Sequence, residues 1–230
     1  IADGDEAIFD YPADERMLTR FYDNQSIADE QYSDLTNGSG TTQIGQKEYS
    51  TSASWYGIQF INDEVGFAVG SNGTIIKLTD NGDVTEITNT DEPQHDLTDV
   101  EFVNDMIGFI VGEGGIIRRT DNQGVTWPRV ISPTAENLND IYFVDMSTAY
   151  IAGDNGVILK TTNGGFTWVD LEIEVDPTQL PMANTTIENY DISALQFRNS
   201  EEGMAVANSG LIIRTMDGGD TWESHDEANV

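Results

Sequence analysis

A unit of about 40 residues recurs four times in the chain, and this repeat restricts the possible fold more than any other feature. A phenylalanine opens each unit, and a basic residue follows it 17 positions later: Phe60 and Lys77, Phe102 and Arg119, Phe143 and Lys160, Phe197 and Arg214. The four phenylalanines are 42, 41 and 54 residues apart. Such a period predicts units that each bury an apolar face against a neighbour.

Each unit contains four short segments with the residue pattern of β-strands. The first alternates apolar and polar residues, as in Leu97–Phe102 and Leu138–Phe143. Two apolar segments of the types GFIVG and VILK follow, with Gly, Asn and Asp at the junctions, where turns form readily. Four strands in about 40 residues predict a propeller blade, whereas a parallel solenoid of β-turns normally has a shorter period. The glycine content and the period of two exclude helical repeats.

A glycine-rich turn and a tryptophan follow in three of the four units, with the sequences TDNQGVTW, TTNGGFTW and TMDGGDTW. The fourth strand is predicted to begin at this tryptophan. The repeated positions are Thr120, Asn122, Gly124, Thr126 and Trp127; Thr161, Asn163, Gly165, Thr167 and Trp168; and Thr215, Asp217, Gly219, Thr221 and Trp222. The first unit keeps Asp80 and Gly82 but has Thr85 where the others have tryptophan.

These turns resemble the Asp box of BNR repeats, and the units resemble those of the photosystem II stability/assembly factor-like family. The resemblance covers about Trp55 to Glu223 and implies an all-β propeller of four-stranded blades. Family members usually have more than four blades. The four recognisable blades therefore belong to a larger ring, or the N-terminal region supplies a degenerate blade. The factor that names the family is associated with photosystem precursors and with a basic patch. Because this chain has only ten basic residues, the resemblance does not imply that specific role.

The pattern predicts two regions. Residues 54–230 form the propeller repeats, at about 54–90, 96–132, 137–175 and 190–226, and residues 1–53 form an acidic N-terminal extension. Within the extension, Ala13–Tyr32 has the pattern of an amphipathic helix, and Asn37–Thr42 that of a linker. The apolar face of this helix is expected to pack on the propeller or on another domain.

We expect the Asp boxes to be structural, because they recur in blade after blade while a binding site is usually single. The Asn or Asp side chain should accept backbone N–H groups across its own turn, and the glycine should supply backbone freedom. The tryptophan should pack between neighbouring blades, with its N–H bonded to a partner.

The sequence predicts no catalytic site. It has two histidines, His95 and His225, and no cysteine, which makes a zinc site or a nucleophilic triad improbable. A sialidase-like glycoside hydrolase is a weaker alternative, because BNR repeats occur in sialidases and such enzymes need an arginine cluster. Arg119 and Arg214 instead occupy the repeated basic position, which indicates a structural role and pairing with acidic neighbours.

No cofactor is expected. Calcium is the one metal that the sequence suggests, because Asp3–Glu6 and Asp80–Gly82 carry oxygen ligands. Neither segment has the twelve-residue spacing of a full calcium loop, so solvated acidic turns are the favoured interpretation.

The net charge of −31 comes from 41 acidic and 10 basic residues. Such a surface repels phosphates and anionic membranes, which excludes nucleic acid as a partner, and no apolar run is long enough to insert in a membrane. The charge suits an extracellular, cell-surface or virion protein, although ordinary solubility would also account for it.

The third and fourth units are separated by an insertion within Leu171–Tyr190. In a propeller, such a connection lies on the same face as the turns between second and third strands, where partner sites commonly arise. We therefore predict a partner loop containing Asp176, Leu180, Met182 and Asn184, with a plain long loop as the alternative. The expected function is a non-enzymatic scaffold that binds protein or glycan partners. The alternative is a structural component of a virion or surface appendage, in which the chain self-assembles.

Overall fold

The computed structural model describes residues 53–79, 82–87, 94–182 and 185–224. The chain divides into two compact units, Ile1–Ile44 and Gly45–Val230, and every described residue belongs to the second. The predicted N-terminal extension with its helix at Ala13–Tyr32 lies outside the described residues, as do Asp3–Glu6, Asn184 and His225. The predicted boundary at residue 53 therefore stays a prediction.

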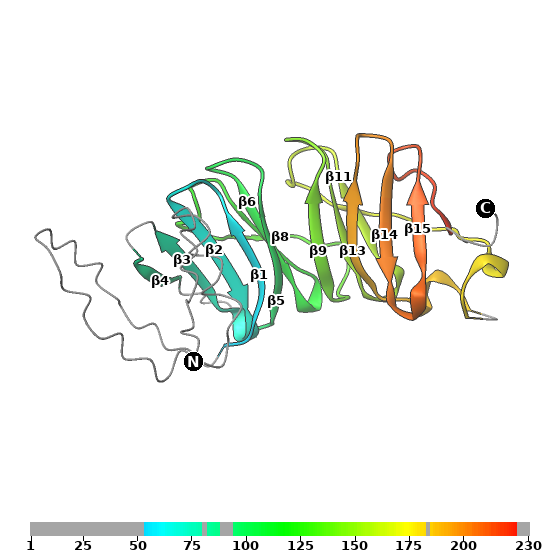
Figure 1. Ribbon diagram of the computed structural model, residues 1–230, viewed down its shortest axis with the longest axis horizontal. Helices are drawn as coiled ribbons and strands as arrows, with labels where there is room; N and C mark the ends of the chain where they lie inside the picture. The colour runs from blue at the N-terminus through cyan, green and yellow to red at the C-terminus, as the bar shows by residue number, and fades with distance from the viewer. Residues whose placement is uncertain (1–52, 80–81, 88–93, 183–184, 225–230) are drawn as a thin grey trace, which may run out of the picture. The chain divides into compact units, whose positions relative to one another are not determined.

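The described chain folds into four antiparallel sheets of four strands each, in chain order, as predicted for propeller blades (Figure 1). The first two blades consist of β1 (Trp55–Phe60), β2 (Val65–Gly70), β3 (Ile75–Thr79) and β4 (Val84–Ile87), then β5 (Leu97–Phe102), β6 (Gly108–Gly112), β7 (Ile116–Thr120) and β8 (Arg129–Val130). The third and fourth consist of β9 (Leu138–Phe143), β10 (Ala149–Gly153), β11 (Ile158–Thr161) and β12 (Val169–Asp170), then β13 (Ile192–Phe197), β14 (Gly203–Ala207), β15 (Ile212–Thr215) and β16 (Glu223–Ser224).

The repeat sets the register of every blade. The opening phenylalanine pairs with the small residue six positions on, as in Phe102 with Gly108. A Cβ atom on Gly108 would lie 2.6 Å from the Phe102 ring, so the glycine leaves room for that ring to fold over the second strand. Successive blades then contact one another through their first strands, β1 with β5, β5 with β9 and β9 with β13.

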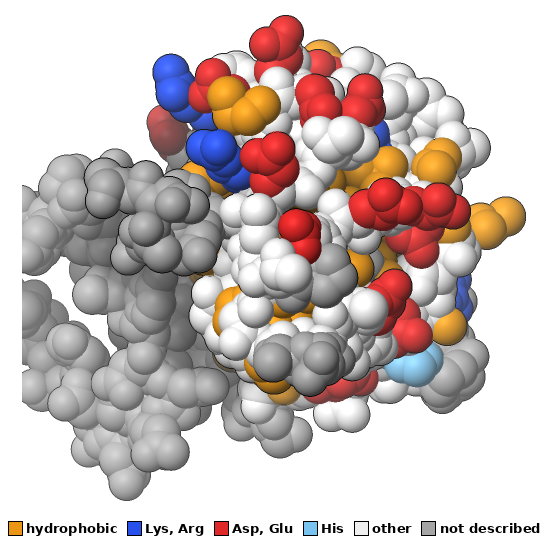
Figure 2. Space-filling model, turned by 90° about the vertical axis from the view of Figure 1, so that its right-hand side faces the viewer, with side chains coloured by type: hydrophobic (Ala, Val, Ile, Leu, Met, Phe, Trp, Pro, Cys, Tyr) orange, Lys and Arg blue, Asp and Glu red, His pale blue; other side chains and the backbone are white. Residues whose placement is uncertain are grey.

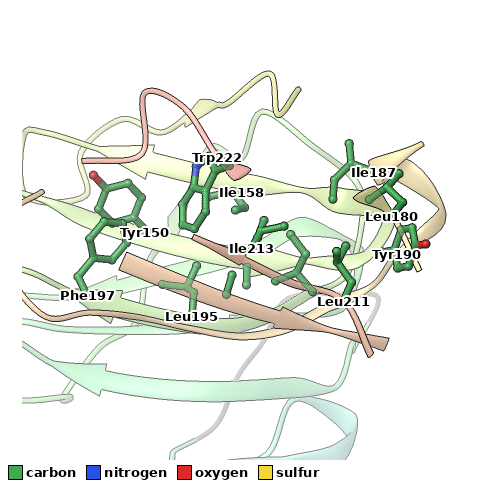
Figure 3. Packing of buried hydrophobic residues seen from close by; sticks show 13 residues of the cluster. Tyr150, Ile158, Leu180, Ile187, Tyr190, Leu195, Phe197, Leu211, Ile213 and Trp222 are labelled. Atoms are coloured by element: carbon green, nitrogen blue, oxygen red, sulfur yellow. The ribbon is translucent and has the colours of Figure 1, made fainter. Parts of the chain in front are cut away.

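Buried side chains lie between successive blades. We call the side of a blade that meets the following blade its leading face. Phe67, Phe109 and Tyr150 lie at the same position on the leading faces of the first three blades, each at most 1% exposed. They stack on Phe102, Phe143 and Phe197 of the following blade, with ring centroids 4.9, 4.8 and 4.0 Å apart. Figure 3 shows the core between the third and fourth blades, where Tyr150 lies against Phe197.

The turns between second and third strands are single 3₁₀ turns: η1 (Ser71–Gly73), η2 (Glu113–Gly115), η3 (Asp154–Gly156) and η6 (Asn208–Gly210). The residue in the middle of each adopts a positive φ, for example 55° at Asn155. Each of the last three is hydrogen-bonded to the connection that enters its blade, as in Asp154 N to Asn137 O at 2.9 Å. The connections and these turns therefore share one face, as predicted.

The fourth strand is the one element that starts later than expected. It was predicted to begin at the tryptophan, but β8 begins two residues after Trp127, and β12 begins one residue after Trp168. The tryptophan is still part of the box turn and points into the core, so pairing with the third strand begins only beyond it. Blade one, which lacks the tryptophan, has a longer fourth strand, β4.

Candidate functional site

The Asp boxes close their own turns with side-chain hydrogen bonds. In the third blade, Asn163 Oδ1 accepts from Thr167 N at 3.0 Å, which is the predicted contact. Thr161 Oγ1 also accepts from Gly165 N at 3.1 Å, a contact that the sequence analysis did not anticipate. The other two boxes repeat both contacts. The boxes therefore satisfy turn N–H groups that would otherwise compete for water.

The glycine of the box serves two purposes. Gly165 has a φ of +76°, and a Cβ atom there would lie 2.2 Å from the Phe109 ring of the preceding blade. The box tryptophan fills the space beside this contact, with Trp168 6% exposed and its ring edge-on to Phe109 at 6.3 Å. The prediction that the tryptophans pack between blades is confirmed.

The expected partners of the indole N–H groups are not found. The Nε1 atoms of Trp127, Trp168 and Trp222 are buried and have no hydrogen-bond acceptor among the described residues. The rings are oriented by aromatic packing, and the second strands around them contribute mainly apolar side chains. Aromatic packing therefore determines the orientation of each tryptophan, although it leaves the indole N–H group without an acceptor among the described residues.

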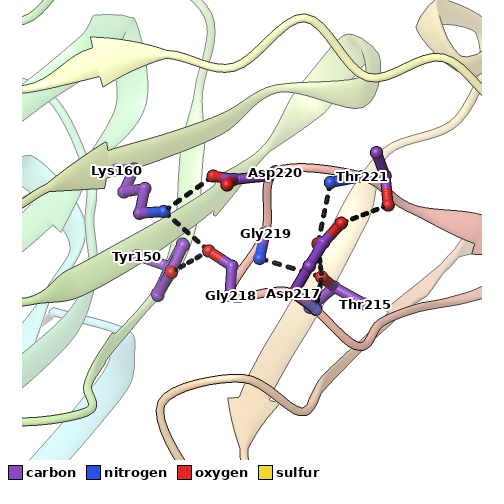
Figure 4. Close-up of polar contacts among 8 residues, drawn as sticks. All are labelled: Tyr150, Lys160, Thr215, Asp217, Gly218, Gly219, Asp220 and Thr221. Carbon is purple, nitrogen blue, oxygen red and sulfur yellow. Dashed lines mark hydrogen bonds and ion pairs between the residues drawn. The ribbon is translucent and has the colours of Figure 1, made fainter.

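Three of the repeated basic residues, Lys77, Arg119 and Lys160, contact the box of the following blade, as Figure 4 shows for Lys160 and the box of the fourth blade. Lys160 Nζ donates to Gly218 O at 2.7 Å and lies 3.3 Å from Asp220 Oδ1, while the Tyr150 hydroxyl donates to the same carbonyl. Lys77 makes the equivalent bond to Gln123 O. Arg119 and Arg214 lie near Asp121 and Glu223, as the predicted pairing required. These cations are structural.

Hydrogen bonds within the fourth box also fix the ionisation of its acid. The pKa of Asp217 is lowered to about 2, chiefly by the hydroxyl of Thr221 and then by the Thr221 and Thr215 contacts. Asp217 is consequently ionised across the physiological range and serves as an acceptor, the role that Asn122 and Asn163 fill in the other boxes.

The predicted partner loop is folded against the fourth blade. Leu180 is 7% exposed and belongs to the core shown in Figure 3. Asp176 accepts from Thr178 N at 2.9 Å and caps the 3₁₀ turn η4 (Pro177–Gln179). Met182 is partly buried on the same core, and its N–H donates to the Tyr190 hydroxyl. A partner that approached this loop would therefore meet exposed acidic side chains such as Asp176. The role of the loop in binding stays a prediction.

A second surface combines exposed apolar side chains with arginine. A groove of about 580 Å³ lies between the outer part of the second blade and the box of the third. We call it the box groove. Its lining residues are Arg119, Pro128, Arg129, Val130, Ile131, Pro133, Gly165, Phe166, Thr167 and Trp168. Ile131 is 90% exposed and Phe166 67% exposed, and the guanidinium of Arg119 lies 4.5 Å from the Phe166 ring centroid.

The box groove is distinctive within the repeat. The residue before the Thr-Trp pair is Val125, Phe166 or Asp220 in the three boxes, and each box lies beside the basic residue of the preceding blade. Where that residue is Asp220, it pairs with Lys160, whereas Phe166 leaves a flat aromatic surface over Arg119. Phe166 was not predicted as a site residue, because the three boxes were interpreted as equivalent structural units. The change of residue type at this position was the available signal.

The residues that line the box groove include two arginines and no acidic residue. Figure 2 shows one side of the molecule, where acidic side chains are spread among hydrophobic ones and basic side chains are few. Arg119 and Arg129 both line the groove, and within the described part of the chain Arg129 forms no ion pair. An anionic group could thus be bound there, although the chain as a whole repels anions.

Buried carboxyl groups on the first strands form a separate cluster. Asp99 accepts from Ile141 N, Glu101 from Phe143 N and Asp140 from Leu195 N, at 3.1, 3.1 and 2.7 Å. Burial, with the neighbouring carboxyl groups, raises the pKa of Asp99 to about 7 and that of Glu101 to about 8. Such shifts occur at active sites, but these groups do not line the box groove, and each bonds the next blade. Their contacts are structural.

The described residues include neither a candidate metal site nor a candidate membrane-spanning helix. No group of three His, Cys, Asp or Glu side chains there is placed to hold a metal ion. Calcium binding at Asp3–Glu6 or Asp80–Gly82 stays a prediction, since those segments lie wholly or partly outside the described residues. In the same part of the chain, no helix has the length and apolar character that crossing a bilayer requires.

Four-stranded blades, three of which carry an Asp-box turn between their third and fourth strands, define a β-propeller protein. The family described as photosynthesis system II assembly factor YCF48 matches residues 40–133 and 130–229. The chain belongs to this family, as the Asp boxes and the upstream phenylalanine positions predicted. No curated protein sequence gives a significant match.

Solved structures agree on the fold. YCF48 from Cyanidioschyzon merolae is 20% identical with a TM-score of 0.61, and the match covers 79% of this chain and 59% of that one. A structure described as YCF48 bound to D1 peptide is 18% identical with a TM-score of 0.48, covering 78% and 84%. An ancestral GH74 enzyme is 15% identical with a TM-score of 0.56, covering 78% and 26%. The chain thus spans about three fifths of the length of the Cyanidioschyzon protein.

Proposed function

We propose that the chain is a non-enzymatic, protein-binding propeller, and that the box groove docks a segment of its partner. The observation that carries the proposal is the combination of exposed Phe166 and Ile131 with Arg129 around one groove. Aromatic residues and arginine are enriched where protein partners bind most strongly. Membership in a family described as an assembly factor supports a role in binding other proteins.

The groove favours an extended peptide with an apolar side chain beside a carboxylate. The apolar side chain would lie against Phe166 and Ile131, and the carboxylate would pair with Arg129. The pairing is partly screened by solvent, so the apolar contact should supply most of the affinity, and the arginine most of the selectivity.

The other functional hypotheses receive no comparable support. The GH74 match reflects a shared fold alone at 15% identity. Among the described arginines, Arg118, Arg119 and Arg129 lie in the second blade and Arg198 and Arg214 in the fourth, so the groove holds two arginines. The glycan, virion and appendage hypotheses gain nothing from the fold. A location outside the cytoplasm stays a prediction from composition, and recovery of the native protein only in a cytosolic fraction would contradict it.

A random-peptide display selection tests the proposed function. Peptides selected on the wild-type chain should combine an apolar residue with a nearby Asp, Glu or terminal carboxylate. They should lose most of their binding to Phe166→Ser and to Arg129→Glu. Val125→Ser is the matched control, because Val125 is 66% exposed at the same box position one blade earlier. Equal loss with Val125→Ser, or no enrichment of any peptide class, would contradict the proposal.

A further inference from the structure

The Leu171–Tyr190 insertion contains a groove that is separate from the box groove. It has a volume of about 500 Å³ and is lined by two segments, residues 173–176 and 186–188. We call it the insertion groove. The second segment includes the start of the 3₁₀ turn η5 (Ile187–Asn189), which contacts η3, one of the turns between second and third strands. The insertion groove therefore lies at the same face of the blades as those turns.

The apolar residues that line the insertion groove are held by the core. Ile187 is 6% exposed and belongs to the core between the third and fourth blades, where Figure 3 shows it at one end. Ile173 and Val175 are partly buried and pack against the same core. A hydrogen bond from Thr186 N to Asn189 Oδ1, at 3.0 Å, closes the turn of the second segment. The groove therefore presents a preformed apolar surface to a ligand.

Three exposed carboxylates, Glu174, Asp176 and Glu188, line the insertion groove together with these apolar residues, and no basic residue does. The backbone N–H of Thr178, and then its hydroxyl, lowers the pKa of Asp176. The hydroxyl of Thr186 lowers the pKa of Glu188 in the same way. Both carboxyl groups are therefore ionised at neutral pH, and the groove carries negative charge beside its apolar surface.

The sequence around the insertion groove carries no opposite charge. Between Lys160 and Arg198 there is no Lys, Arg or His, whereas there are six acidic residues: Asp170, Glu172, Glu174, Asp176, Glu188 and Asp191. Figure 2 faces the end of the molecule at which the insertion lies in Figure 1, and acidic side chains are spread over that end. A cationic group in the groove would therefore not compete with a basic side chain of the lining.

The backbone of residues 172–175 is also free to pair with a partner. These residues follow β12 and form no backbone–backbone hydrogen bond with other described residues. Their exposure alternates, because Glu172 and Glu174 are exposed while Ile173 and Val175 are partly buried. Such alternation is typical of an extended segment. Extended backbone without partners can pair with a strand of another chain.

We propose that the insertion groove binds an extended peptide of a partner protein in which basic residues alternate with apolar ones. The peptide would pair with the backbone of residues 172–175. Because paired strands place their side chains on matching faces, its basic residues would lie beside Glu172 and Glu174, and its apolar residues beside Ile173 and Val175. This proposal is independent of the box groove, whose charged lining residues are arginines.

Fluorescence anisotropy with two labelled peptides tests the proposal on the full chain. One peptide alternates lysine and valine, and its isomer places the same lysines and valines in separate blocks. The alternating peptide should bind several-fold more tightly, because only it separates basic and apolar groups onto opposite faces. Glu174→Gln combined with Glu188→Gln should weaken its binding at least about threefold. Equal affinity for the two isomers, or no binding of either, would overturn the proposal.

Asp105→Asn combined with Glu201→Gln is the matched control for the loss of charge. Both residues are exposed and lie on turns between first and second strands, at the opposite end of the blades from the insertion groove. This variant should bind the alternating peptide as the wild type does. An equal loss of binding in the two double variants would indicate general attraction to an acidic surface, which also overturns the proposal.

Hydrogen exchange locates the contact without any substitution. The alternating peptide should slow amide exchange at residues 172–175, because their N–H groups become hydrogen-bonded, and should leave residues 129–133 of the box groove unchanged. In a display selection, peptides of this kind would form a separate class whose binding Phe166→Ser does not alter. Protection at residues 129–133 instead, or at neither segment, would overturn the proposal.

Discussion

At the scale of single residues, the molecule is held together by side chains that repeat and is distinguished by those that do not. Trp127, Trp168 and Trp222 occur in three of the four blades and are all at most 6% exposed. Phe166 occurs once and is 67% exposed. An exposed apolar patch is more informative about function than a buried core residue, so Phe166 together with Ile131 in the box groove is the better guide.

Replacement of Trp168 by alanine should destabilise the chain without abolishing its fold. The side chain is buried against Phe109 of the preceding blade, and truncation of a buried tryptophan costs about 3–5 kcal/mol. Equilibrium denaturation in urea would measure the loss. Val169→Ala, at a neighbouring residue that is 61% exposed, should cost less than about 0.5 kcal/mol. Equal losses for the two variants would refute the packing role.

The buried carboxyl groups make stability depend on pH in an unusual direction. The pKa values of Asp99 and Glu101 are raised in the folded state, to about 7 and about 8, mainly because burial disfavours the charged form. Their protonated forms therefore stabilise the fold fully below the unfolded pKa values of about 4. This contribution should be lost as pH rises from about 4 to about 8.

The free energy of unfolding, measured by urea titration at several pH values, should thus fall across that range. Glu101→Gln keeps an acceptor for Phe143 N and cannot ionise, so its stability should vary less with pH than that of the wild type. Glu64→Gln is the control, since Glu64 is exposed and its substitution should leave the pH profile unchanged. A wild-type profile that is flat or rises over this range would contradict the assignment.

At the scale of elements, the repeat predicted the strands, their order and the face on which the turns lie. The period and the Asp boxes suffice for this because each local pattern agrees with the global fold. Two details were not predictable in the same way. The late start of the fourth strand depends on how Trp168 turns inward, and the unbonded indole N–H groups depend on which side chains surround them.

The box turn should tolerate no side chain at its second glycine. Gly165→Ala introduces both a strained positive φ and a clash with the Phe109 ring, so we expect a loss of at least about 2 kcal/mol. Gly210 is a matched control, because its φ is +80° and its Cβ would meet nothing within 4 Å. Gly210→Ala should cost about 1 kcal/mol, from the strained backbone alone. Thermal unfolding compares the two, and equal costs would show that the contact with Phe109 is unimportant.

The Leu171–Tyr190 insertion shows where sequence reasoning reaches its limit for a site. The insertion was identifiable from blade spacing, and its position on the turn face was correct. Its apolar residues, however, could belong either to a partner surface or to the core. The structure assigns Leu180, Ile187 and Tyr190 to the core, since each is at most 7% exposed. Burial of this kind depends on the folded path of the loop, which spacing alone does not specify.

At the scale of the whole molecule, the family and the fold were predictable, and the box groove was not. Family resemblance rests on residues that three or four of the blades share, such as Trp127 and Trp168, and these residues pack in the core. The box groove arises only when two blades are placed side by side, because β8 belongs to the second blade and the box that faces it belongs to the third. No pattern within a single repeat could show that juxtaposition.

The central claim is that the box groove is where this propeller binds its partner, and hydrogen exchange with a selected peptide tests it most directly. Added at saturating concentration, the peptide should slow amide exchange within residues 129–133 and 163–168, two segments from different blades that include most of the groove-lining residues. The equivalent box segments 122–126 and 217–221 should exchange at unchanged rates, and Phe166→Ser should abolish the protection. Protection that appears at the Leu171–Tyr190 insertion instead, or equally at all three boxes, would contradict the claim.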